Sequence, residues 1–360
     1  MTDRTRLTAV LAAAFVCAAS PLHAQVLPGG LLNRAENMIE RGDENGARNV
    51  LQRADRLSAK AAFLLGSMCE DGRGGPADLD CAVAAYASAA NDGLADAQYA
   101  MGRLVLAGTT GRADAEPDPS GAADWFALAV VQEHPQAMVA LGRLHAEGNG
   151  VAIDEVYAAD LFERAARVGD PEGAYELARA YQLGRGRAQS FDRARRWYEP
   201  AVDAGHIDAQ YRLGLLLRAG LGGAPDPARA EQLIRAAALA DHPAAMTAVG
   251  VMTLRSGAGS GEMRAAQAAD WFERGAEAGD DEGMFLLAVV YAQGRGRPMD
   301  AQKALELVEA SLAAAPSNLN PRERAARIAL RDALLAPPEP EPDLLAEGGD
   351  GETPPETPQR

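Results

Sequence analysis

The chain has 360 residues and a formal net charge of −16, because 51 acidic residues outnumber 35 Lys and Arg residues. Nucleic-acid binders take affinity for phosphates from clustered Lys and Arg, so this balance argues against nucleic acid as a partner. Aromatic residues make up only 5% of the chain, and there are 37 glycines. This composition favours a core of closely packed small side chains.

The first 24 residues have the pattern of a cleavable export signal. Arg4 and Arg6 precede an apolar run at residues 7–19, and a cleavage site follows Ala24. Cys17 offers a lipoprotein alternative, but the three residues before it do not match the small residues that such a site requires. No later segment reaches eighteen uncharged apolar residues, so we expect no membrane insertion after cleavage. The expected location is periplasmic or secreted.

One short pattern recurs seven times along the rest of the chain. It first appears as Ala61–Gly66, and we call its last position the anchor. The anchors are Gly66, Gly102, Gly142, Ala178, Gly214, Gly250 and Ala288, separated by 36, 40, 36, 36, 36 and 38 residues. Such near-constant spacing indicates a repeat architecture.

Each repeat has two halves with helical periodicity. The first half usually ends at a glycine, which takes the left-handed conformation at no steric cost. These glycines are Gly72, Gly108, Gly148, Gly184, Gly220 and Gly294. The second half centres on an alanine followed by paired large apolar residues, as in Ala122 with Trp125 and Phe126. Each repeat is therefore predicted to be a helical hairpin, with Gly or Ala where the two helices approach closely.

The Ala-x-x-x-Leu-Gly, Tyr-x-x-Gly-x-Gly and Lys/Arg-Ala-x-x-Trp-Tyr-x-x-Ala-Ala-x-x-Gly signatures resemble Sel1-like repeats of the exported bacterial type, relatives of the tetratricopeptide repeat. The resemblance implies an all-α, right-handed α/α solenoid of about seven hairpins with capping helices. We expect N-terminal capping helices in residues 25–60, the solenoid in residues 61–315 and a C-terminal capping helix in residues 316–336. Longer turns at Thr109–Ser120 and Ser256–Glu262 are candidate contact surfaces.

Two cysteines, Cys69 and Cys81, remain after removal of the signal. An isolated pair in an oxidising compartment is a disulfide candidate. Cys69 lies at the end of a predicted first helix and Cys81 near the start of the second, so hairpin geometry brings them together. The alternative is two separate small core residues, and the Cα spacing decides between the two.

Three histidines, His134, His206 and His242, occupy the same repeat position, a whole repeat or more apart. Ligands of one metal ion must lie within a few ångströms of one centre, so we interpret these histidines as structural turn residues. We also interpret Gly184-Arg-Gly-Arg and Gly294-Arg-Gly-Arg as turns, because neither continues into the Lys of a phosphate loop. No catalytic residues, metal site or cofactor are predicted, and the chain is not expected to be an enzyme.

Two positions of the first helix, three before the anchor and one after it, lie four residues apart and share a helix face. The candidate binding residues there are Tyr99, Arg103, Arg143, Tyr175, Arg179 and Tyr211. Equivalent residues stack along a solenoid, so the three arginines are expected to form a ladder. The resemblance implies that this face lines the concave groove that receives ligands.

Tyrosine and arginine are enriched at interaction hot spots, and aligned arginines on an acidic protein indicate a partner with a carboxylate-bearing segment. The alternative is that the aromatic residues only pack between repeats, and that the arginines pair with nearby Glu or Asp.

Residues 337–360 contain seven prolines, seven acidic residues and one arginine. This composition is typical of a disordered tail. We expect it to serve as a tether, as a solubiliser or as an autoinhibitor that competes for the arginine ladder.

The expected function is a protein–protein interaction scaffold or adaptor in the cell envelope. The resemblance implies the regulation or assembly of a membrane sensor, a secretion system or a polysaccharide system. One alternative is a secreted hydrolase that acts on cell-wall material, which the missing catalytic constellation disfavours. The other is a secreted factor that binds a host protein, which the sequence does not separate from the first.

Overall fold

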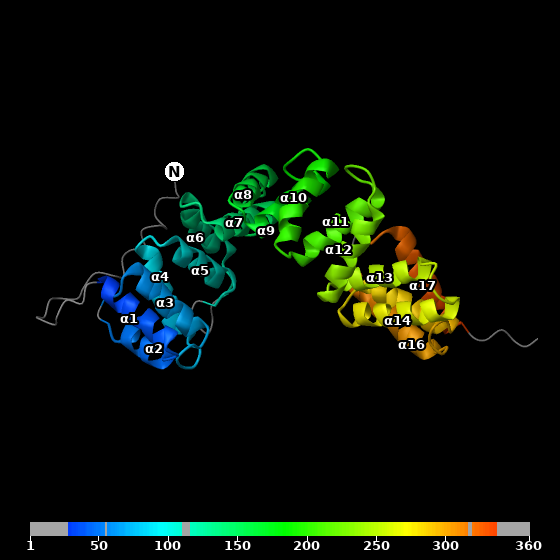
Figure 1. Cartoon of the computed structure of the whole chain (residues 1–360), viewed down its shortest axis with the longest axis horizontal. Coiled ribbons are helices and arrows are strands. Elements are labelled where there is room, and N and C mark those ends of the chain that lie inside the picture. Colours follow the sequence, from blue (N-terminus) through cyan, green and yellow to red (C-terminus); the bar gives the residue numbers. More distant parts are fainter. Residues whose placement is uncertain (1–27, 55, 110–115, 316–318, 337–360) are drawn as a thin grey trace, which may run out of the picture. The chain divides into compact units, whose positions relative to one another are not determined.

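A computed structural model of the chain describes residues 28–54, 56–109, 116–315 and 319–336, and its regular structure there is entirely α-helical (Figure 1). The helices are α1 (Pro28–Glu40), α2 (Glu44–Gln52), α3 (Ala59–Glu70), α4 (Leu79–Asn91), α5 (Ala95–Leu106), α6 (Pro119–Val131), α7 (Pro135–Glu147), α8 (Glu155–Arg167), α9 (Pro171–Leu183), α10 (Phe191–Asp203), α11 (Ile207–Ala219), α12 (Pro227–Leu239), α13 (Pro243–Arg255), α14 (Gly261–Glu277), α15 (Asp281–Gln293), α16 (Ala301–Ala314) and α17 (Pro321–Leu335). The predicted all-α solenoid of helical hairpins is confirmed. The predicted signal, the predicted tail and residues 110–115 of the second repeat's long turn lie outside the described residues.

The chain divides into two compact units. The N-terminal unit comprises Met1–Leu177 and Arg185–Arg187, and the C-terminal unit comprises Ala178–Gly184 and Ala188–Arg360. Seven consecutive helix pairs, from α3–α4 to α15–α16, each carry one anchor in their first helix. The pair α1–α2 precedes them, and α17 follows them.

The helices begin where short polar side chains cap them. Asp118 Oδ1 accepts a hydrogen bond of 2.9 Å from the backbone N–H of Gly121, at the start of α6. The other second helices of the repeats begin in the same way, at Asp78, Asp154, Ser190, Asp226, Ser260 and Asp300. Each cap satisfies a backbone donor that the helix itself leaves unpaired.

The anchor glycines mark the closest approach of the two helices in a hairpin. A Cβ atom added to Gly142 would lie 2.5 Å from a ring carbon of Phe162, and one on Gly250 would lie 2.5 Å from Phe272. Phe272 is fully buried. A side chain at these anchors would therefore displace the large residue that fills the hairpin core, which explains the glycine in the repeated pattern.

The turn between the two helices of a repeat packs against the preceding repeat. Gly186 has a φ of +64° and packs directly against the backbone of Glu155, at the start of α8. The neighbouring Arg187 pairs with Glu163 of α8 at 3.1 Å. Arg297 of the seventh repeat pairs in the same way with Asp270 of α14, at 2.5 Å. The two Gly-Arg-Gly-Arg segments are therefore turns, as predicted, and their second arginines tie adjacent repeats together.

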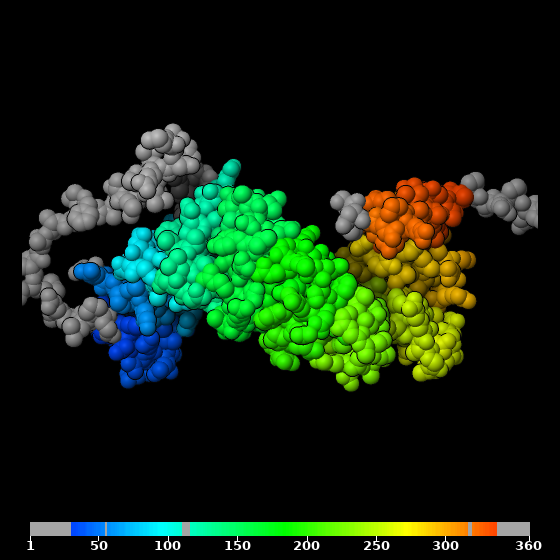
Figure 2. Space-filling view, turned by 90° about the horizontal axis from the view of Figure 1, so that it is seen from above, coloured from blue at the N-terminus to red at the C-terminus, as the bar shows by residue number. Residues whose placement is uncertain are grey.

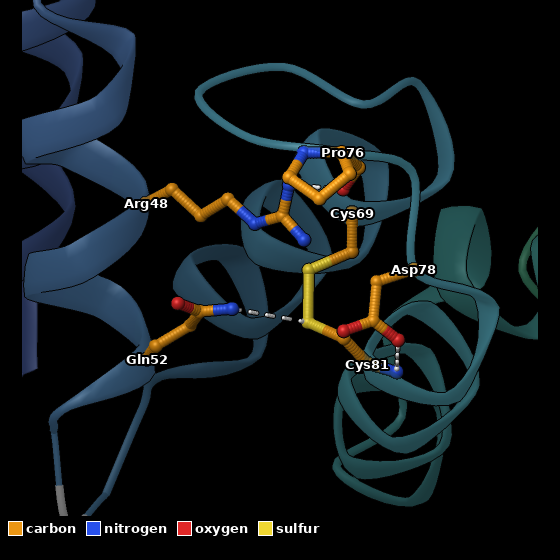
Figure 3. Close-up of a disulfide and its surroundings, with 6 residues drawn as sticks. All are labelled: Arg48, Gln52, Cys69, Pro76, Asp78 and Cys81. Carbon is orange, nitrogen blue, oxygen red and sulfur yellow. Dashed lines mark hydrogen bonds between the residues drawn. A yellow bond between two sulfur atoms is a disulfide. The ribbon is translucent and has the colours of Figure 1, made fainter.

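A disulfide between Cys69 and Cys81 closes the turn of the first repeat, with the two Cα atoms 5.9 Å apart (Figure 3). Two side chains of α2 reach this turn. Arg48 Nη1 donates to the carbonyl oxygen of Pro76 at 2.8 Å, and Gln52 Nε2 lies 3.8 Å from Cys81 Sγ. The disulfide candidate thus forms a bridge, and the helix pair before the repeats packs against it.

Helix α17 closes the C-terminal unit through a buried arginine. Figure 2 shows α17 in orange, lying against the other helices of this unit. The Arg327 side chain is 1% exposed and pairs with Asp281 at 2.7 Å and Glu282 at 2.9 Å. Its guanidinium also lies 5.6 Å from the ring centre of Phe285. Both carboxylates belong to the first turn of α15, so α17 is fixed to the last hairpin.

Candidate binding site on the first helices

The N-terminal unit has an open pocket of about 380 Å³ on the predicted face of α5. Its walls come from α3, α4, α5 and the start of α7. The residues that line it include Phe63, Tyr86, Asp96, Tyr99, Arg103 and His134. Tyr99 and Arg103, predicted to share a helix face, therefore meet in one pocket.

Aromatic rings form most of the pocket wall. The rings of Phe63 and Tyr86 lie 5.5 Å apart between centres, and Tyr99 stacks on His134 at 5.0 Å. Tyr99 also packs at 5.8 Å against Phe126, the buried residue that faces the anchor Gly102. These contacts pack each ring of the pocket wall against a neighbouring ring.

Arg103 is the cationic group of the pocket. Its Nη2 pairs with Glu70 Oε1 at 2.9 Å, and its guanidinium lies 6.0 Å from the ring centre of Tyr99. The side chain remains 47% exposed. Tyr86 donates a hydrogen bond of 2.7 Å to the other oxygen of Glu70. A guanidinium has five N–H donors, so Arg103 can bind a second carboxylate while it keeps Glu70.

The Tyr86 hydroxyl is held in its protonated form by burial and by its hydrogen bond to Glu70. Burial, followed by the hydrogen bond to Glu70, raises the pKa of Tyr86 well above its ordinary value of 10.0. An ionised Tyr86 would be a buried negative charge beside the Glu70 carboxylate, so the neutral hydroxyl is strongly favoured. Glu70 is therefore held by a donor on each oxygen.

His134 is a helix cap, as its repeat position predicted. Its Nδ1 accepts from the backbone N–H of Ala137 at 3.2 Å, which leaves Nε2 to face Asp96 Oδ1 at 3.3 Å. Asp208, Tyr211 and His242 repeat this arrangement in the C-terminal unit, with an Nε2–Oδ1 distance of 3.4 Å and a ring separation of 4.6 Å. His206 caps α11 in the same manner. Within the described segments, no three His, Cys, Asp or Glu residues gather closely enough to hold a metal ion.

Arg143 is tied down by acidic residues more firmly than Arg103. Its Nε donates to Glu176 Oε1 at 2.7 Å, and its Nη2 pairs with Glu172. Burial lowers the pKa of Arg143, but Glu176 and Glu172 outweigh this effect and the net pKa is raised. For Arg143 and Arg103, the pairing with acidic neighbours that we gave as the alternative is present.

The remaining predicted residues lie elsewhere. Tyr175 is only 7% exposed and offers little surface to a partner. Arg179 and Tyr211 belong to the C-terminal unit, where the Tyr211 ring packs against His242. Of the six predicted binding residues, Tyr99 and Arg103 are the two that line this pocket.

Sequence reasoning missed Glu70, Asp96 and His134 as members of the site. Asp96 stands three residues before Tyr99, so the helical spacing that paired Tyr99 with Arg103 also places Asp96 on that face. Glu70 and His134 come from the neighbouring repeats. Their place in the pocket depends on how the repeats stack, which spacing within one helix does not reveal.

Comparison with known proteins shows the same repeats. A model of the Sel1 repeat matches residues 59–94, 95–130, 135–170, 171–206, 207–242, 243–280 and 281–313. No relative among curated proteins matches the chain. Within the described residues, no helix has both the length and the apolar character needed to cross a membrane.

Two solved structures share the fold. One is c5321, a protective antigen present in uropathogenic Escherichia coli strains that displays an SLR fold. It is 24% identical, with a TM-score of 0.57 and coverage of 80% of this chain and 70% of that chain. The other is a Sel1 repeat protein from Oxalobacter formigenes, 23% identical, with a TM-score of 0.59 and coverage of 84% and 96%. At this identity, the likeness concerns the fold alone.

Proposed function

The chain belongs to the Sel1 repeat family, and from that premise we propose that it is an exported scaffold that holds an acidic segment of a partner protein. Sel1 repeats typically mediate protein–protein interaction and generally do so without catalysis. The observation that carries the proposal is the pocket of the N-terminal unit, where aromatic side chains line the wall beside the partly exposed guanidinium of Arg103.

The chemistry of the pocket indicates what it binds. Its aromatic walls suit an apolar side chain, and Arg103 suits a carboxylate next to that side chain. Asp96 and Gln136 also line the pocket. The Asp96 carboxylate can accept a hydrogen bond from a backbone N–H of an extended segment, and the Gln136 amide can donate to its backbone carbonyl. A short stretch of partner chain with one apolar and one acidic side chain therefore fits the site.

The proposed location is the cell envelope, where the protein would regulate or assemble a membrane sensor, a secretion system or a polysaccharide system. The signal pattern of the first 24 residues supports export. The Cys69–Cys81 disulfide supports it too, because such bridges persist in oxidising compartments. Recovery of the protein from culture medium, and not from the periplasm, would favour the alternative of a factor that binds a host protein.

The test is capture of partners from a gently cross-linked envelope fraction, with wild type compared to Arg103→Glu and Tyr99→Ala. The matched control is Arg196→Glu, because Arg196 is an exposed arginine of α10 that pairs with Asp192. Loss of a hot-spot residue typically costs about 2 kcal/mol or more, so we expect at least a roughly 30-fold weaker interaction. Arg143 is unsuitable as a probe, since its replacement would remove the arginine partner of the buried Glu176 and could destabilise the fold.

A protein captured by wild type and by Arg196→Glu, but lost with both pocket variants, supports the proposal. Equal capture by all four chains would show that the pocket is not the binding site. A chain that captures no protein at all would contradict the scaffold role itself. Far-ultraviolet circular dichroism must show unchanged helix content in every variant.

A further inference from the structure

The C-terminal unit has a second pocket, of about 460 Å³, with a different character. It lies between the first part of α14 and the last part of α15. The apolar residues that line it are Leu254, Phe272, Leu286, Val289 and Val290. Val289 follows the anchor Ala288 directly, so it occupies the repeat position that Arg103 holds in the N-terminal pocket.

The predicted long turn of the sixth repeat, Ser256–Glu262, overlaps the start of α14, which begins at Gly261. Gly261 and Glu262 belong to the pocket rim, and Leu254, just before the turn, keeps 43% of its surface exposed. Apolar surface that stays open to water in a concave site indicates that another group covers it. The last two residues of the predicted turn, Gly261 and Glu262, therefore lie at the pocket as part of α14.

Two arginines that line the pocket have N–H donors that form no hydrogen bond or ion pair within the described residues. Arg264 Nη1 donates to the carbonyl oxygen of Gly259 at 2.9 Å, while its Nε is buried with no hydrogen-bond partner among the described residues. Arg295 is exposed and forms no ion pair with any residue that the structure describes. Arg297, two residues later, is fully engaged by Asp270 and Glu273. An apolar pocket with two such cations fits an acidic segment that carries leucine-like side chains.

We propose that this pocket is the docking site of residues 337–360 of the same chain, which insert Leu344 and Leu345. These are the only large apolar residues in the segment, and its seven acidic residues complement Arg264 and Arg295. The proposal concerns the C-terminal unit alone and does not depend on the function proposed for the Tyr99–Arg103 pocket.

The end of α17 brings the segment close to the pocket. Leu334 packs on the apolar cluster that contains Phe272, and Leu286 and Val290 pack on that cluster too. Leu344 lies eight positions after Ala336, and an extended chain spans about 3.3 Å per residue, so Leu344 can reach up to about 26 Å from the helix end. Attachment also raises the local concentration to the millimolar range, so even a weak intrinsic affinity fills the pocket.

In the docked state, the pocket is filled by a segment of the same chain. Residues 337–360 cover the apolar surface until a partner segment with the same leucine and carboxylate chemistry displaces them. In this proposal the segment occupies the apolar pocket of its own unit, a different site from the arginine ladder predicted from the sequence.

The first test is site-specific photo-crosslinking in the full chain. A Leu254→benzoylphenylalanine variant places the photoreactive group at the pocket, and Leu239→benzoylphenylalanine serves as the control, because Leu239 is 71% exposed on α12 of the same unit. We expect position 254, and not 239, to crosslink to residues 337–360 within one chain, with at least a tenfold loss of yield after Leu344→Ser and Leu345→Ser. Equal yields at both positions, a yield unchanged by the serines, or crosslinks only between chains would overturn the proposal.

The second test measures affinity. A fluorescent peptide of residues 337–360 is added to full chain that carries Leu344→Ser and Leu345→Ser, and its anisotropy is followed. We expect saturable binding that Arg295→Glu weakens about tenfold, as charge reversal at a complementary site does. Arg185→Glu is the matched control, since Arg185 is the exposed first arginine of the equivalent turn in repeat four. Chain with intact leucines should bind the peptide at least tenfold more weakly.

The proposal fails if the peptide does not bind saturably, if Arg185→Glu weakens it as much as Arg295→Glu, or if intact leucines make no difference. None of these results bears on capture of a partner through Arg103, so the two proposals fail separately.

Discussion

The pocket of the N-terminal unit and the pocket of the C-terminal unit differ at one repeat position, the residue that follows the anchor. In the N-terminal unit this residue is Arg103, in an aromatic and polar pocket, whereas in the C-terminal unit it is Val289, in an apolar pocket. The anchors themselves hardly vary, because Gly102 and Gly250 each face a buried phenylalanine. The repeat thus constrains what packs inside the hairpin and leaves the outward face free to take different chemistry.

The two units are also closed by different means, and the largest expected effect tests this difference at the C-terminal end. Arg327→Ala removes a buried cation from Asp281 and Glu282 and leaves a cavity under α17. Breaking such a pair costs about 3–4 kcal/mol. Hydrogen exchange should show this loss in the C-terminal unit and none in the N-terminal unit. Arg331→Ala, a control on the same helix that breaks only the pair with Asp332, should have little effect.

Reduction of the disulfide tests the other end. The loop that Cys69 and Cys81 close is short, so removing the bridge should cost about 3 kcal/mol in the chain-entropy model. The sequence has no cysteine beyond Cys81, so denaturation of the C-terminal unit should not respond to reductant. A double Cys69→Ala, Cys81→Ala chain should unfold like reduced wild type. An equal response of both units would contradict the independent closure of the two ends.

Anchor substitution should affect both units alike. Gly102→Ala gains up to about 1 kcal/mol of helix propensity. Its new Cβ meets the fully buried ring of Phe126, and overpacking of this kind costs about 1–3 kcal/mol. With the full gain in propensity, we expect a net loss of up to about 2 kcal/mol in chemical denaturation for Gly102→Ala and for Gly250→Ala. Gly261→Ala, whose Cβ meets nothing within 4 Å, is the control and should not destabilise.

The smallest expected effect concerns the polar network of the N-terminal pocket. Tyr86→Phe removes the hydrogen bond to Glu70, which should cost about 1 kcal/mol at neutral pH. The folded-state pKa of Tyr86 is raised, so above about pH 10 the unfolded chain loses the proton while the folded chain keeps it. The stability of wild type should therefore fall as the pH rises beyond 10, and Tyr86→Phe should reduce this fall. Denaturation at pH 8 and pH 11 measures both effects, and an unchanged pH slope would contradict the assignment to Tyr86.

The hairpins could be predicted from the sequence because their cause is local. An anchor glycine, the large residue that faces it and the glycine after the first helix lie within one repeat, so their spacing is visible in the letters. The same reasoning makes Cys69 and Cys81 a candidate pair, since one hairpin turn separates them, but the Cα distance of 5.9 Å that decides for the bridge comes from the structure.

The pockets could not be predicted in full because their residues come from different repeats. Glu70 reaches Arg103 from the preceding repeat, and the acidic partners of Arg143 come from the following one. Both directions are compatible with the spacing, and only side-chain packing decides between them. The apolar pocket had a weaker signal still, because Val289 in a helix reads as an ordinary core residue.

The turn glycines give the array a direction of assembly. The turn glycines pack against the N-terminal part of the second helix in the preceding helix pair, as Gly74, Gly150, Gly186, Gly222 and Gly296 do. The helix residues that these glycines contact all come earlier in the sequence than the glycines themselves. A polypeptide that emerges from its N-terminal end, during synthesis or translocation, can therefore complete each turn against a hairpin that already exists. These turn contacts can thus form in the order in which the residues appear, without the far end of the chain.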